Sequence, residues 1–244
     1  MNPTNSPTIN CAHRGASGHA PENTIAAVEK AIALGATMAE IDIQQTADDK
    51  FAVFHDDLLD RVTNGVGPLW DKTLAELQVL DAGSWFGPGY AGERIPSLVE
   101  VLETTRGRLP LNIELKLHGH ERQLVDLVIR TLRDNNIEDH CLVTCFDHRV
   151  AVAVKQADGA LTVGAILGIQ QYSDGIFALP VDVLSVEKSL VDKVFMTAAR
   201  DAGKQVHVWT VNEPEEFRRL INFGVDAVIT NYPDRFGGPQ EGQS

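Results

Sequence analysis

The stretch Leu111-Asn112-Ile113-Glu114-Leu115-Lys116-Leu117 alternates apolar and polar residues without a break. A side-chain period of two belongs to a β-strand, so the apolar residues share one face and Asn112, Glu114 and Lys116 share the other. Burying charged side chains on one face of a strand is costly unless they are paired or bind a metal. This strand therefore predicts both a packed outer face and a polar inner site.

Two other stretches have the same parity. In Ala39-Glu40-Ile41-Asp42-Ile43 the isoleucines can pack outward, which turns Glu40 and Asp42 to the opposite face. In Val206-His207-Val208-Trp209 the histidine and the tryptophan share one face in the same way. We therefore expect several strands to contribute polar groups to one interior.

Short apolar runs alternate with segments of helical spacing along most of the chain. We expect eight strands, over Ile9–His13, Met38–Gln44, Leu111–Leu117, Cys141–Phe146, Leu161–Leu167, Val181–Val186, Val206–Val211 and Ala227–Thr230. The clearest helical segments are Asn23–Leu34, Arg122–Asn135, His148–Ala157, Leu190–Ala202 and Glu213–Phe223. Eight alternating βα units predict a single domain over residues 1–244, an α/β fold of the (β/α)₈ TIM-barrel type. The fifth unit has only a poor helix signal, over residues 168–180.

One segment interrupts the alternation after the second strand. Residues 56–95 are rich in Gly and Pro and carry large aromatic residues, Trp70, Trp85, Phe86 and Tyr90 among them. Only Lys72–Leu80 has helical spacing, and long loops in compact domains are usually functional or disordered. Because so many aromatic residues argue against disorder, we expect a small inserted lid that covers the leaving part of a substrate.

Composition excludes several classes of function. The chain has 244 residues, 43% of them hydrophobic, and a formal charge of −13. This acidic excess argues against nucleic acid as a partner. No apolar run approaches the ~20 residues of a membrane-spanning helix, so no integral membrane segment is expected. The absence of a basic signal region and three cysteines without a metal-binding spacing predict a cytoplasmic protein.

The three inward carboxylates of Glu40, Asp42 and Glu114 need a counter-charge. An internal ion-pair network is one explanation, but a single lysine, Lys116, does not neutralise three carboxylates. A hard divalent cation with oxygen ligands relieves the repulsion, and Mg²⁺ or Ca²⁺ are the natural candidates.

Two histidines differ from the other six in their position. His13 and His55 each end an extended apolar run, and barrel enzymes keep their chemistry at the C-terminal ends of the strands. Arg14 and Lys116 supply positive charge for an anionic group such as phosphate. Together with the carboxylates, these residues predict metal-assisted phosphoryl chemistry with histidine as acid and base.

These motifs, in this order, resemble the glycerophosphodiester phosphodiesterase family. The segments that carry the resemblance are His13-Arg14-Gly15, Pro21-Glu22-Asn23-Thr24, Glu40-Ile41-Asp42, His55-Asp56, Thr63-Asn64-Gly65, Gly92-Glu93-Arg94-Ile95-Pro96, Asn112-Ile113-Glu114-Leu115-Lys116, Val208-Trp209-Thr210-Val211-Asn212, Gly224-Val225-Asp226 and Thr230-Asn231-Tyr232-Pro233-Asp234. They span about residues 9 to 235. One segment departs from the family, because Thr144-Cys145-Phe146-Asp147 stands where Ser-Phe-Asp is usual.

The resemblance implies a barrel with a small insertion after the second strand. It also implies metal-dependent hydrolysis of a glycerophosphodiester to sn-glycerol 3-phosphate and an alcohol. Carried over to this chain, Glu40, Asp42 and Glu114 bind the metal, and His13 and His55 act as acid and base. Arg14 and Lys116 then contact the phosphate, and Trp209 lines the glycerol.

Two other functions stay open at this point. A phospholipase D of the sphingomyelinase type uses a similar barrel and histidine pair, although such enzymes are commonly secreted and bear disulfides. A catalytically silent barrel that binds phosphate or glycerol is the other, although it has no need of both histidines. The sequence leaves open the head group, the native metal, whether water or the glycerol 2-hydroxyl attacks, and the oligomeric state, a homodimer included.

Overall fold

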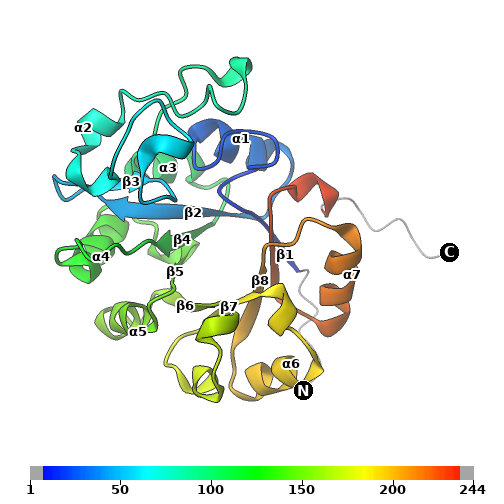
Figure 1. Ribbon diagram of the computed structural model, residues 1–244. Coiled ribbons are helices and arrows are strands. Elements are labelled where there is room, and N and C mark those ends of the chain that lie inside the picture. Colours follow the sequence, from blue (N-terminus) through cyan, green and yellow to red (C-terminus); the bar gives the residue numbers. More distant parts are fainter. Residues whose placement is uncertain (1–7, 237–244) are drawn as a thin grey trace.

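Eight parallel strands close into a barrel in this computed structural model, which describes residues 8–236 (Figure 1). The strands are β1 Ile9–Ala12, β2 Met38–Gln45, β4 Leu111–Leu115, β5 Cys141–Cys145, β6 Thr162–Leu167, β7 Val183–Glu187, β8 Gln205–Trp209 and β9 Ala227–Thr230. Their order is β1-β9-β8-β7-β6-β5-β4-β2, and pairing of β1 with β2 completes the ring. The short β3, Phe51–Val53, pairs antiparallel with β2. The predicted TIM-type fold is confirmed.

Helices surround this ring (Figure 1). They are α1 Ile25–Ala33, α2 Leu74–Leu77, α3 Leu98–Thr105, α4 Leu124–Asp134, α5 His148–Ala157, α6 Lys193–Asp201 and α7 Pro214–Phe223. Gly35, Gly203 and Gly224 follow three of them with φ between 69° and 77°, a left-handed conformation that a helix end commonly needs and that glycine adopts at little cost. Between β6 and β7 there are only short 3₁₀ turns, which agrees with the poor helix signal of the fifth unit.

The sequence interpretation missed two elements near the insertion. It contained neither β3 nor α3, so the second βα unit looked incomplete, whereas α3 supplies its helix. The signal was present, because Ser97 and Glu100 form a capping box in which each side chain accepts a hydrogen bond from the other residue's backbone N–H. The helix predicted over Lys72–Leu80 is shorter, a single turn over α2.

The segment between β3 and α3 has an apolar cluster of its own. Its buried members, separate from the main core, are Ala52, Phe54, Leu59, Val62, Leu69, Leu74, Leu77, Ala82 and Ile95. Figure 1 shows this part, with α2, gathered at one side of the barrel. The segment is therefore packed and not an open loop.

Strand parity separates the two faces of the barrel wall as expected. Ile41, Ile43, Ile113 and Leu115 belong to the main apolar core with the helices. Cys11, Cys141 and Cys145 are buried and unpaired, as small core residues. Within residues 8–236, no helix has the length and apolar character needed to cross a membrane. The predicted leader, Met1 to Pro7, lies outside the described residues.

Candidate active site

The sheet register brings the three predicted metal ligands together. Glu40 and Asp42 lie two residues apart on β2, and Asp42 pairs in register with Glu114 on β4. One carboxylate oxygen from each residue lies within 4.8 Å of the others. Glu40 is 3% exposed and Asp42 is 1% exposed, so these charges have little contact with solvent. The three acidic residues form one buried oxygen-rich cluster that could hold a cation.

The pKa values of the cluster record this crowding. Burial, followed by the charges of Asp42 and Glu114, raises the pKa of Glu40 well above its usual range. Burial and the Asp42 charge likewise raise the pKa of Glu114 to about 7. Burial acts in the same direction on Asp42, but the Arg14 and Lys116 charges outweigh it and lower the Asp42 pKa. Without a bound metal ion, the ionised forms of Glu40 and Glu114 are therefore electrostatically unfavourable.

Two positively charged side chains, Lys116 and Arg14, already lie among the carboxylates. Lys116 Nζ is 2.8 Å from Glu114 Oε1 and 3.8 Å from Asp42 Oδ1. Arg14 Nε is 3.3 Å from Asp42 Oδ2, and its Nη1 is 2.8 Å from Glu22 Oε1. Lys116 and Arg14 therefore form an ion-pair network with the carboxylates. Arg14 is also paired with Glu22, so these two positive side chains do not balance the acidic residues around them. A divalent cation fits the donor chemistry of this site.

His13 is held by a neutral partner. It directly follows β1, and its Nδ1 lies 2.7 Å from Asn231 Oδ1. Because the amide oxygen only accepts, Nδ1 carries the proton and Nε2 keeps its lone pair. Burial and then the Arg14 charge lower the His13 pKa to about 4. His13 is therefore a neutral imidazole with a free acceptor nitrogen.

His55 is held by a charged partner instead. Its Nδ1 lies 2.7 Å from Asp56 Oδ1, and Asp56 in turn bonds Arg61 of the insertion. Burial raises the Asp56 pKa, yet the bonds from Arg61 and His55 lower it to about 2, so this carboxylate is ionised. The partner of His55 is thus an ionised carboxylate, whereas the partner of His13 is a neutral amide.

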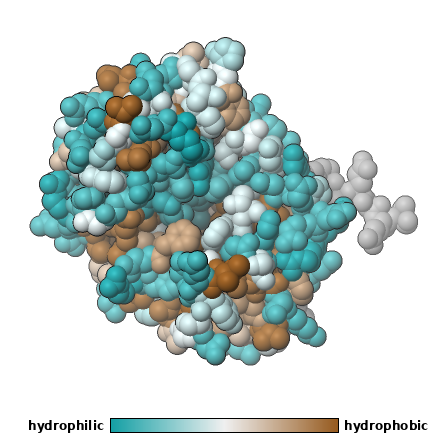
Figure 2. Space-filling model, in the orientation of Figure 1, coloured by the Kyte–Doolittle hydropathy of each residue, from teal (hydrophilic) through white to brown (hydrophobic). Residues whose placement is uncertain are grey.

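The predicted residues surround one small cavity. A space of about 140 Å³ is lined by all of them except Asp42, which is buried against the other carboxylates. Trp209 lines this space at the end of β8, with its Nε1 donating to Ser185 O at 3.1 Å, and contacts Phe146 edge-on at 5.8 Å between ring centroids. Figure 2 shows that this face of the molecule is mostly hydrophilic and hollowed near its centre.

Several supporting residues had no role in the sequence interpretation. Asn23 donates to Asp42 Oδ2 at 2.8 Å and accepts from the Asp42 backbone N–H at 3.2 Å. Asn23 and Arg14 both have a positive φ, of 58° and 53°, which is uncommon outside glycine and tends to occur at functional sites. Glu22, Asn23, Asp56 and Asn231 belong to the motifs that carry the family resemblance, but the sequence assigned none of them a role. Their contacts, and not their spacing, reveal what they do.

The aromatic residues of the insertion lie elsewhere than expected. Trp85, Phe86 and Tyr90 pack edge-on against one another, and the Tyr90 hydroxyl donates to His19 O at 2.7 Å. None of the three lines the 140 Å³ cavity or the larger one beside it. The expectation that they cover the leaving alcohol is corrected, because their apolar rings find partners within the insertion.

Comparison with known proteins identifies this arrangement. Residues 13–235 match the model of the glycerophosphoryl diester phosphodiesterase family. The chain belongs to this family. A glycerophosphodiester phosphodiesterase of Caldanaerobacter subterraneus is 35% identical, over 93% of this chain and 95% of its own. One from Bacillus subtilis is 32% identical, over 96% of this chain and 87% of its own.

Solved structures agree with the sequence relatives. A phosphodiesterase of Oleispira antarctica, in complex with the product sn-glycerol-3-phosphate, is 33% identical with a TM-score of 0.87 and 94% of each chain covered. A glycerophosphodiester phosphodiesterase of Agrobacterium tumefaciens is 27% identical with a TM-score of 0.83, over 94% of this chain and 99% of its own. The recognition of the family from its motifs is confirmed, and with it the assignment of the chain as a phosphodiesterase.

Proposed function

We propose that this member of the glycerophosphodiester phosphodiesterase family hydrolyses a glycerophosphodiester to sn-glycerol 3-phosphate and an alcohol. The observation that supports this is a 140 Å³ cavity lined by two differently held histidines and by two members, Glu40 and Glu114, of the three-carboxylate cluster. The product complex of the Oleispira relative supports the glycerol phosphate half of the substrate.

In this proposal Glu40, Asp42 and Glu114 hold a divalent cation, Mg²⁺ or Ca²⁺. When bound, the cation offsets negative charge that develops on a phosphate oxygen. Arg14 and Lys116 line the same cavity and supply further positive charge for the phosphate. Trp209 lines the side that takes the glycerol.

The two histidines take opposite roles. His13 Nε2 accepts a proton from the attacking hydroxyl, either of water or of the glycerol 2-hydroxyl, while Nδ1 stays bonded to Asn231. His55, whose Nδ1 is hydrogen-bonded to the ionised Asp56, gives a proton to the departing alkoxide. If the 2-hydroxyl attacks, the same pair in reversed roles opens the cyclic phosphate with water. That two-step route leaves both imidazoles as they began. If water attacks the diester directly, proton exchange with solvent must return His13 to the neutral form and His55 to the protonated form.

The direct test is turnover with and without a chelator. We expect release of glycerol 3-phosphate from a glycerophosphodiester, loss of that activity in excess chelator, and its return on adding Mg²⁺ or Ca²⁺. Turnover of choline lysolipids, with none of the deacylated diester, would favour the phospholipase D function instead. Binding of glycerol phosphate without any turnover would favour the silent barrel.

A second test uses the strained carboxylates and does not depend on turnover. Glu114 has a pKa of about 7 in place of 4.5, so its proton stabilises the fold fully below pH 4.5 and less as the pH rises through 7. Ionised carboxylates are also the form that binds a cation. We therefore expect Mg²⁺ or Ca²⁺ to raise the Tm more at pH 8 than at pH 5.5.

The control for this measurement is Glu114→Gln, which has no proton to lose at that position. The pH dependence of the metal-induced rise in Tm should be weaker in this variant. An equal rise in Tm at both pH values in the parent protein would contradict the three-carboxylate site.

A further inference from the structure

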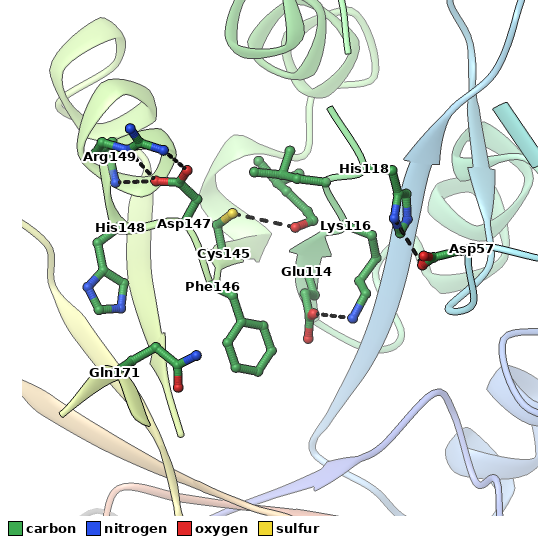
Figure 3. Close-up of a pocket in the computed structure, with 12 residues that line it drawn as sticks. Asp57, Glu114, Lys116, His118, Cys145, Phe146, Asp147, His148, Arg149 and Gln171 are labelled. Carbon is green, nitrogen blue, oxygen red and sulfur yellow. Dashed lines mark hydrogen bonds and ion pairs between the residues drawn. The ribbon is translucent and has the colours of Figure 1, made fainter. Parts of the chain in front are cut away.

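A second and larger cavity opens beside the catalytic one. It has a volume of about 840 Å³ and shares Glu114, Lys116 and Phe146 with the 140 Å³ cavity. In Figure 3 Glu114 and Lys116 lie between the ring of Phe146 and the pair Asp57–His118. A group attached to a phosphate at Lys116 can therefore extend directly into this space.

Asp57 occupies the border of two spaces that leave the catalytic centre. It lines the 840 Å³ cavity, and it also lines a cavity of about 450 Å³ that reaches His55 and Lys116. Asp57 therefore lies beside both routes by which an alcohol protonated by His55 can leave. Its side chain is 64% exposed, so it is accessible to such a group.

The other charges around these routes have partners of opposite sign, except Asp60, whose Oδ2 accepts a hydrogen bond from the Gly67 backbone N–H at 3.0 Å. Asp147 Oδ2 is 2.7 Å from Arg149 Nη2, and Glu114 is bonded to Lys116. Arg61 is engaged by Asp56 and Glu22. Within residues 8–236, the group at ion-pair distance from Asp57 is His118, whose Nδ1 lies 2.9 Å from Asp57 Oδ1.

His118 lies beside Asp57 without cancelling its charge. The His118 Nε2 is buried and has no hydrogen-bond partner among the described residues, which disfavours a second proton on the ring. Burial lowers the His118 pKa, which agrees with this state. The imidazole stacks on Trp70 of the insertion, with 5.2 Å between ring centroids. Asp57 is thus an exposed acidic side chain beside a histidine that burial keeps neutral.

We propose that the 840 Å³ cavity receives the leaving alcohol and that Asp57 makes the site prefer an alcohol with a positively charged nitrogen. This inference rests on the proposed function, because it names the head group of the same substrate. Phe146 supports it, since its ring is 37% exposed and already faces the ammonium of Lys116 at 5.7 Å from the centroid.

The test compares two substrates that differ in head-group charge, glycerophosphocholine and glycerophosphoglycerol. We expect Asp57→Asn to lower the ratio of kcat/KM for the choline over the glycerol ester by about 1.5- to fivefold, the range of one exposed charge pair. Asp57→Glu should retain most of the ratio. Added salt should lower the ratio in the parent protein and have little effect in Asp57→Asn.

The matched control is Asp201→Asn, which removes one negative charge at the exposed end of α6. Because the helices run back against the strands, this end lies at the face opposite the site, and the ratio should not change. An unchanged ratio in Asp57→Asn, with both substrates still turned over, would overturn the inference and leave the proposed function intact. A parent protein that hydrolyses neither substrate would contradict the proposed function itself.

Discussion

His55→Ala should lower kcat for a choline or glycerol diester by about 10²–10⁴, the usual contribution of general acid catalysis. An alkoxide is a poor leaving group and needs a proton, and the proposed mechanism assigns its donation to His55. A p-nitrophenolate leaves without one, so His55→Ala should recover much of its lost rate on a p-nitrophenyl phosphodiester. The measurement is the ratio of aryl to alkyl rates relative to the parent protein.

His13→Ala should behave differently, although its loss on alkyl diesters is expected to be of similar size. The base is needed whatever the leaving group, so this variant should stay slow on the aryl diester. The structural reason for this assignment is the pair of partners, an amide from Asn231 for His13 and a carboxylate from Asp56 for His55.

The control is His140→Ala, because His140 is exposed and directly precedes β5, at the face opposite the site. It should leave both rates unchanged. A larger aryl rescue in His13→Ala than in His55→Ala would reverse the two roles. No rescue in either variant would contradict acid–base catalysis by this pair.

Removing a carboxylate from the cluster should have a comparably large effect on activity and opposite effects on stability. Glu40→Gln and Asp42→Asn should each reduce turnover about 10²-fold or more, since a catalytic cation of the proposed kind would supply several kcal/mol of charge stabilisation. Without a cation, Glu40→Gln should be as stable as the parent protein or more stable. In the parent protein, burial and repulsion raise the pKa of the Glu40 carboxyl. The amide oxygen of Gln can still accept the hydrogen bond from the Arg14 backbone N–H.

Asp42→Asn should destabilise the same metal-free protein by about 1–3 kcal/mol, because Arg14 and Lys116 lose a buried partner. Repulsion among the carboxylates would by itself favour a gain in stability, but Asp42 is the member of the cluster whose pKa is lowered by Arg14 and Lys116. The check is thermal unfolding in chelator beside turnover at limiting metal, with Asp201→Asn as a control. Near-normal rates in either variant at limiting metal would remove that residue from the metal site.

The composition of the site followed from strand parity. Each strand alternates its faces, so Glu40, Asp42 and Glu114 had to share an interior whatever the surrounding loops did. The positions of His13 and Trp209 followed in the same way, from the ends of apolar strands. These conclusions needed only local periodicity and the regular barrel that the alternating elements predict.

Other features depend on side chains that are distant in sequence. Asn231 reaches His13 across 218 residues, and only closure of β1 against β9 makes that contact. Trp85, Phe86 and Tyr90 were assigned to the substrate because of their type, yet their rings pack on one another and the Tyr90 hydroxyl bonds the backbone of His19. The type of a residue in a long insertion does not determine which other residues it packs against.

The sequence by itself determined the barrel, the family and the set of candidate site residues, because periodicity and motif order are local properties that survive any loop arrangement. The tertiary structure alone decided the different partners of the two histidines, the sign of each carboxylate's electrostatic strain and the place of Asp57 between two cavities. These depend on distances of a few ångströms between groups far apart in the chain. Electrostatic and hydrogen-bond energies change steeply over such distances.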